Sequence, residues 1–290
     1  MDDLFNKRPN QFTEADMNQL SKKQKKALKV LFGSKPSVPF SLATFDDCER
    51  SDGLALNIAY ATVKVPTIHI PVDFVKPTAS DHLCENLARI EKVWVLNNER
   101  AYRIVINAIL IEVLMTETNE QLWGFCDVKN DWEGIGVIYT GAVDYMFGSG
   151  RIKSVDTMDS SFLVVQAKKE WPDSSIPQVL CAAGCALRKR MAAGKNTPVF
   201  AALTNGLFFR FFVIDTDGMV YASTTHLLDI GDDETYKSST SLSEILRWFT
   251  WFMTSIKSVS PGYYSEDVTP QVIDNSLTRI RSCFGPTHPI

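Results

Sequence analysis

Residues 141–170 read GAVDYMFGSGRIKSVDTMDSSFLVVQAKKE, and this stretch decides the predicted fold. Within it, residues 162–168 have the alternation of a β-strand, whose side chains project in turn to opposite faces of a sheet. Both faces begin apolar, so we expect a central strand that is covered on both sides. At its end, one face changes to Gln166 and Lys168. Because a buried Lys is costly unless it is paired, solvated or used, this strand end is a candidate site.

A carboxylate stands in the preceding β-like run, at Asp144. A hairpin-like connection that begins at residues 148–150 would bring Asp144 beside Gln166. The backbone carbonyl of Ala167 would lie there as well, and Mg²⁺ prefers such oxygen ligands. A metal-bound water is a better nucleophile, and the metal also stabilises charge on a phosphate. Lys168 could orient that water or neutralise the developing negative charge.

The hydrophobic pattern places helices and strands around these two runs. Helices are predicted at 80–96, 99–116, 175–192 and 241–258, with Ser80 or Asp81 as a cap of the first, and Ser241 and Glu244 spaced as a capping box in the last. Strands are predicted at 54–65, 67–75, 121–128, 134–147, 161–168, 198–203, 207–214 and 219–223. From residue 99 the order is helix, strands, helix, strands, helix, which indicates an α/β fold with a mixed sheet flanked by helices.

The bulk composition is that of an ordinary globular protein, with 290 residues, 45% hydrophobic and 22% charged. No run reaches the roughly 18 apolar residues of a membrane span, and the start lacks the features of a secretory signal. We therefore expect an intracellular protein, in the nucleus or the cytoplasm, with no membrane partner. The six cysteines are expected to be free thiols. Cys181 and Cys185 are expected to be core residues, because no His or Cys cluster completes a zinc site.

Two basic segments permit contact with nucleic acid despite a net charge of −4. One is a run of six lysines between residues 22 and 35, near a short helix predicted at 14–31. The other consists of Arg188, Lys189 and Arg190, near the end of a predicted helix. Both segments are equally typical of a solvated helix face or helix end.

Asp144, followed on the next strand by Gln166-Ala167-Lys168, resembles the PD-(D/E)XK phosphodiesterase superfamily, over residues 95–258. The chain departs from the usual motif because Gln166 stands where the family has Glu, which is similar to the QxK motif of the Mrr-like branch. The layout is also similar to the nuclease-like domains of fungal and oomycete Crinkler-type effectors. The resemblance implies a restriction-endonuclease-like fold, a Mg²⁺ or Mn²⁺ cofactor held by Asp144, Gln166 and Ala167, and DNA, or less often RNA, as substrate.

The resemblance also implies further site residues. The superfamily often adds a Glu from the first core helix, where Glu99 and Glu112 compete. Glu99 also suits the helix dipole, and Glu112 stands among apolar residues, so that it faces either the metal or the surface. Gln178, which opens the helix after the motif strand, is expected to contact nucleic acid or to be an ordinary exposed residue.

These patterns divide the chain into a polar basic arm (1–36), an N-terminal extension that packs on the core (37–95), a nuclease-like core (96–260) and a tail (261–290). Three functions remain open: a metal-dependent nuclease, a non-cutting binding or effector protein with the same fold, and an unrelated α/β interaction protein. The aromatic residues at 248, 249, 251 and 252 favour core or dimer packing over a platform for stacking bases. A homodimer is therefore an additional expectation.

Overall fold

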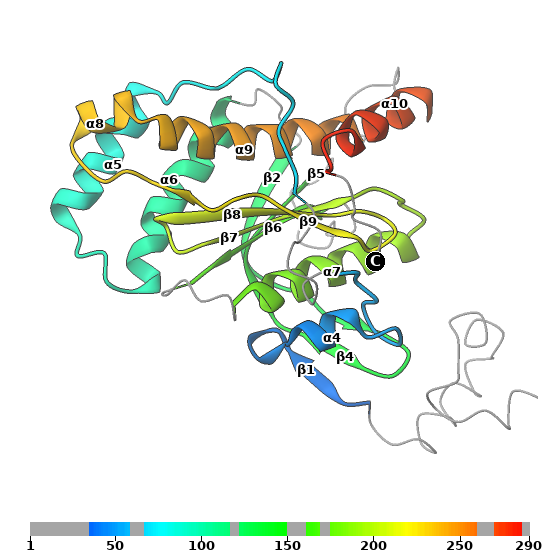
Figure 1. Cartoon of the computed structure of the whole chain (residues 1–290). Helices are drawn as coiled ribbons and strands as arrows, with labels where there is room; N and C mark the ends of the chain where they lie inside the picture. The colour runs from blue at the N-terminus through cyan, green and yellow to red at the C-terminus, as the bar shows by residue number, and fades with distance from the viewer. Residues whose placement is uncertain are drawn as a thin grey trace, which may run out of the picture.

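A mixed sheet dominates the computed structural model, which describes residues 35–58, 67–116, 122–149, 161–168, 175–259 and 270–285 (Figure 1). Its seven strands in these ranges are β2 (Leu122–Lys129), β5 (Ala142–Ser149), β6 (Ser161–Ala167), β7 (Val199–Thr204), β8 (Phe208–Ile214), β9 (Val220–Ala222) and β10 (His226–Leu227). They follow the order β10-β8-β7-β6-β5-β2, with β9 also paired to β8.

Strand directions make the sheet mixed. β6 and β7 run parallel, whereas the other recorded pairs in this sheet are antiparallel. A parallel pair needs a crossover connection, and α7 (Ile176–Ala192) lies between β6 and β7 in the chain. The fold is therefore α/β with a mixed sheet flanked by helices, as the sequence predicts.

Helices cover both faces of this sheet. On one face, α6 (Glu99–Thr116) and α9 (Thr240–Ser258) share a buried cluster with the sheet, in which Phe211 contacts Phe252. On the other face, α7 shares a second cluster that includes Phe212. Figure 1 shows α9 along one side of the sheet and α7 along the opposite side. All six residues of β7 are buried, because both faces of this central strand are covered.

The segment before the core adds one strand to a second, smaller sheet and packs against α7 through two short helices. This sheet has the order β1 (Ser37–Pro39), β4 (Ile138–Thr140), β3 (Trp132–Glu133), and β1 runs parallel to β4. The short helices η2 (Phe40–Leu42) and α4 (Phe45–Glu49) follow β1 and contact α7.

Three more helices lie around α6 and α9. α5 (Asp81–Val93) packs on α6 and on α8 (Asp233–Ser238), and α10 (Pro270–Arg281) packs on α9. Among the helices of the described ranges, none is both long and apolar enough to cross a membrane.

The predicted helices correspond to α5, α6, α7 and α9. Ser80 caps α5 by accepting a hydrogen bond from the amide of Leu83, as predicted. The predicted capping box at the start of α9 is wrong: the cap is Ser239, whose hydroxyl accepts from the amide of Leu242. The tail, predicted without helices, contains α10. The predicted core positions of Cys181 and Cys185 are confirmed by their burial in α7.

The predicted strands differ from the structure in two places. The run at 134–147 breaks at Gly141 into β4 and β5, and Gly141 lies against the ring of Phe40, where a Cβ would overlap it. The runs at 54–65 and 67–75 are wrong as strands where they are described, because Asn57, Thr67 and Ile68 form only isolated bridges. Residues 59–66 and the helix predicted at 14–31 lie outside the described residues.

Candidate functional site

The register of β5 and β6 brings Asp144 to the end of the motif strand. Tyr145 pairs with Val165 in this antiparallel ladder, so the next position places Asp144 opposite residue 166. Asp144 Oδ2 accepts a hydrogen bond from the amide of Ala167 at 2.7 Å. The predicted approach of Asp144 to residue 166 is therefore confirmed for the backbone. The connection does not begin at Gly148, because β5 continues to Ser149, and residues 150–160 lie outside the described ones. The side chain of Gln166 lies outside the described part of the structure.

Asp144 is a buried carboxylate, with 6% of its surface exposed. Burial raises the pKa of its carboxyl above the ordinary value, although the amide of Ala167 and the positive charges of Arg103 and Lys168 oppose this rise. A buried carboxylate that is held by several donors is typical of a functional site, although structural ion pairs also produce this pattern.

Lys168 follows β6 directly and is half-buried. Its backbone amide donates to Thr204 O at 2.8 Å, which continues the pairing of β6 with β7 and fixes the start of the side chain. Burial lowers the pKa of the Lys168 ammonium, while the negative charges of Asp144 and Glu99 raise it. Lys168 directly follows Ala167, whose backbone amide donates to Asp144, so the backbone of Lys168 lies next to this contact.

Sequence analysis missed Arg103, which lies at the centre of this site. Its side chain comes from α6, one turn after Glu99, and Nη2 donates to Glu99 Oε1 at 3.2 Å. Nη2 also donates to Asp144 Oδ1, and Nη1 donates to Asp127 Oδ1 at 3.1 Å. Burial lowers the pKa of Arg103, but the three carboxylates outweigh this effect and raise it above its ordinary value.

Asp127, which sequence analysis also missed, lies on the strand next to Asp144. On β2, the flanking residues Cys126 and Val128 pair with Tyr145 and Val143 of β5, so Asp127 lies opposite Asp144. Its φ of 51° is in the left-handed region, which is uncommon for residues other than glycine. The side chain is 71% exposed and reaches Arg103. A fourth segment of the chain thus contributes to the site.

The two candidate glutamates of α6 have different positions. Glu99 pairs with Arg103 beside Asp144, so it belongs to the site. Glu112 accepts hydrogen bonds from the backbone amide and the hydroxyl of Ser80, both at 2.9 Å. Glu112 therefore stabilises the start of α5. These contacts contradict its expected role as a residue of the metal site. Gln178 is half-buried near the start of α7.

The basic cluster on α7 serves a structural purpose. Arg188 donates from Nε to Leu54 O at 2.7 Å and from Nη2 to Ala55 O at 3.2 Å. Lys189 Nζ donates to Asn130 Oδ1 at 3.0 Å.

Arg190, the third member of that cluster, is 1% exposed and donates to the hydroxyl of Thr197. The expectation that it binds nucleic acid is wrong, because a buried guanidinium cannot reach a phosphate. Arg188 and Lys189 instead direct donors to the protein's own backbone and side chains.

The donor set suits a hard divalent cation by its chemistry, because oxygen ligands from carboxylates are what Mg²⁺ and Mn²⁺ prefer. Three carboxylates contact the guanidinium of Arg103, with Glu99 and Asp144 at Nη2 and Asp127 at Nη1. Within the described ranges no group of three or more His, Cys, Asp or Glu side chains is arranged to hold a metal ion. A metal at Asp144 and Glu99 would therefore compete with Arg103 for their oxygens.

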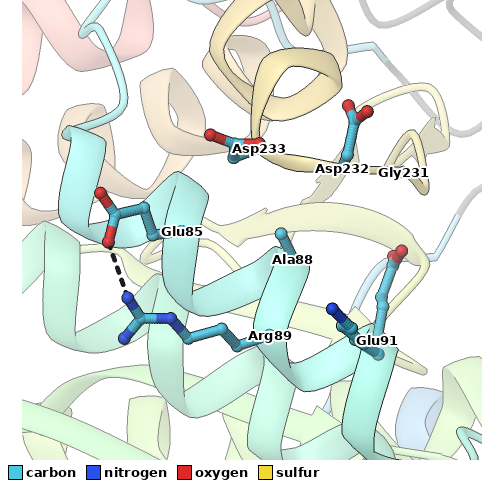
Figure 2. Close-up of a pocket in the computed structure, with 8 residues that line it drawn as sticks. Glu85, Ala88, Arg89, Glu91, Gly231, Asp232 and Asp233 are labelled. Carbon is cyan, nitrogen blue, oxygen red and sulfur yellow. Dashed lines mark hydrogen bonds and ion pairs between the residues drawn. The ribbon is translucent and has the colours of Figure 1, made fainter.

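A separate hollow lies between α5 and the start of α8 (Figure 2). Its lining is mostly charged, and Arg89 donates to Glu85 at 3.0 Å on one side of it. The lining residues are Glu85, Ala88, Arg89, Glu91, Lys92, Gly231, Asp232 and Asp233. None of the residues around Asp144 belongs to this lining, so the two features are distinct.

Comparison with known proteins gives no match, either to a family model or to a characterised protein. The functional assignment therefore depends on the residues around Asp144.

Proposed function

We propose that this protein is a metal-dependent nuclease of the PD-(D/E)XK type, which hydrolyses phosphodiester bonds in DNA or, less readily, in RNA. One observation carries the proposal: Asp144 on β5 and Lys168, directly after β6, lie at the same end of the sheet, and Glu99 of α6 shares Arg103 with Asp144. The order α6, β2, β5, β6, α7, β7 supports it, because it follows the helix–strand–helix order of the core that the motif resembles.

The residues around Asp144 have distinct roles in this proposal. Asp144 and Glu99 would hold a Mg²⁺ or Mn²⁺ ion together with the amide oxygen of Gln166 and the carbonyl of Ala167. The ion, when bound, activates a water and stabilises charge on the phosphate. Lys168 orients the attacking water, because pairing at the end of β6 fixes the start of its side chain. Burial lowers the pKa of its ammonium, so the amine form that can accept a hydrogen bond from the water is favoured.

The test is a cleavage assay on plasmid and single-stranded substrates with Mg²⁺, Mn²⁺ or EDTA. Lys168→Ala should lose cleavage, and EDTA should abolish the activity of the unmodified protein. Lys129→Ala is the matched control, because Lys129 also lies on the sheet but is 79% exposed and pairs with Asp131. Equal cleavage by Lys168→Ala and the unmodified protein contradicts the proposal.

A second candidate function is a non-cutting binding protein with the same fold. The contact of Arg103 with Asp144 favours it, because a permanent ion pair would exclude the metal. This candidate predicts binding of nucleic acid without turnover, with an affinity that falls steeply as salt rises. Binding to a protein partner would instead be largely insensitive to salt.

A further inference from the structure

The guanidinium of Arg103 has three carboxylate partners from three different elements. Glu99 is on its own helix, Asp127 is on β2 and Asp144 is on β5. The Arg103 side chain is 27% exposed, so part of it reaches the surface of the protein. Its Nε atom is buried and has no hydrogen-bond partner in the described part of the chain. One donor is therefore unsatisfied, although a buried polar atom normally has a partner.

Among the residues that the structure describes, the carboxylates of Glu99, Asp127 and Asp144 lie around the guanidinium of Arg103, and Lys168 is a second cation near Asp144 and Glu99. A divalent ion in place of the guanidinium would supply more positive charge at the same point. Mg²⁺ also binds its oxygen ligands at about 2.0–2.1 Å, a distance that the intervening guanidinium does not permit. The same carboxylate oxygens can therefore serve Arg103 or the metal, but not both.

We propose that Arg103 occupies the position of the catalytic metal and is displaced when the metal binds, so that this arginine sets the metal affinity of the site. The inference rests on the proposed nuclease function, because it requires a metal at Asp144. In the metal-bound state the guanidinium leaves Asp144. It then faces solvent, where its planar fork suits a phosphate of the substrate.

The test is a titration of the intact protein with Mn²⁺, followed by calorimetry and by electron paramagnetic resonance of free Mn²⁺. Arg103→Gln should bind Mn²⁺ at least roughly tenfold more tightly than the unmodified protein. The basis is that a neighbouring positive charge changes the acid dissociation constant of a carboxyl group by a factor of about 10 to 1,000. Arg103→Lys keeps the charge but loses the planar fork, so its affinity should lie between the other two. This second variant keeps the test decisive if Arg103→Gln does not fold.

Arg100→Gln is the matched control. It removes a positive charge from the same turn of α6, but Arg100 is exposed. Its Mn²⁺ affinity should equal that of the unmodified protein. If the unmodified protein binds Mn²⁺ and the Arg103 variants bind it equally or more weakly, the displacement of Arg103 is refuted and the nuclease function stands. If neither the unmodified protein nor the Arg103 variants bind Mn²⁺, both proposals fail.

Discussion

Replacement of Asp144 separates its structural contribution from its catalytic one. In Asp144→Ala, the amide of Ala167 loses its acceptor, and this amide belongs to a residue that is 1% exposed. A buried donor without a partner costs about 1–3 kcal/mol. Arg103 loses one of its carboxylates but keeps Glu99 and Asp127, so its charge stays paired. Removal of a buried charge offsets part of the cost.

We therefore expect the free energy of unfolding of Asp144→Ala to fall by about 1–3 kcal/mol. Asp144→Asn keeps an oxygen that can accept from Ala167, so its stability should remain within about 1 kcal/mol of the unmodified protein. Urea unfolding followed by circular dichroism measures both values. Neither variant should cleave DNA with Mn²⁺, because alanine offers the ion no ligand and a neutral amide binds it less strongly than a carboxylate does. A folded Asp144→Asn protein with cleavage close to that of the unmodified protein would refute the reasoning.

Three further predictions concern pH, α5 and α7. Burial raises the pKa of Asp144 in the folded protein. Between the ordinary and the raised pKa, the folded chain therefore binds more protons than the unfolded chain. The free energy of unfolding, relative to that of Asp144→Asn, should fall as pH rises through this window. Urea unfolding across a pH series tests this, and a rise would contradict it. Glu112→Ala should lose about 0.5–2 kcal/mol of stability, because the start of α5 loses its acceptor. Unchanged stability together with lost cleavage would instead place Glu112 in the site. Arg190→Met should lose about 1–3 kcal/mol of stability. Its DNA affinity, measured by fluorescence anisotropy, should equal that of the unmodified protein. Weaker DNA binding at full stability would contradict the buried position of Arg190.

Local sequence patterns predict the elements that carry the site. Alternation at residues 162–168 predicts the central strand, and the apolar helix at 99–116 predicts α6, because both patterns arise from burial of neighbouring positions. The antiparallel approach of Asp144 to Ala167 joins two strands that are consecutive along the chain, β5 and β6. These features depend on contacts between neighbouring segments of the chain or on the regular spacing of apolar residues within one helix or strand.

The residues that sequence analysis missed depend on contacts between distant elements. Arg103 lies four residues after Glu99, a spacing that is common for exposed ion pairs on a helix, so it gave no distinct signal. Only the packing of α6 beside β2 and β5 gives it Asp127 and Asp144 as partners. The break at Gly141 likewise depends on Phe40, about a hundred residues earlier in the chain.

The most direct test of the central claim is DNA cleavage by Lys168→Ala beside Lys129→Ala, in Mn²⁺ and in EDTA. The account predicts cleavage by the unmodified protein and by Lys129→Ala in Mn²⁺, none in EDTA, and none by Lys168→Ala although it folds. Cleavage by Lys168→Ala at the full rate would contradict the assignment of this site. If the unmodified protein shows no cleavage in either metal, the result contradicts the nuclease function and favours the binding protein.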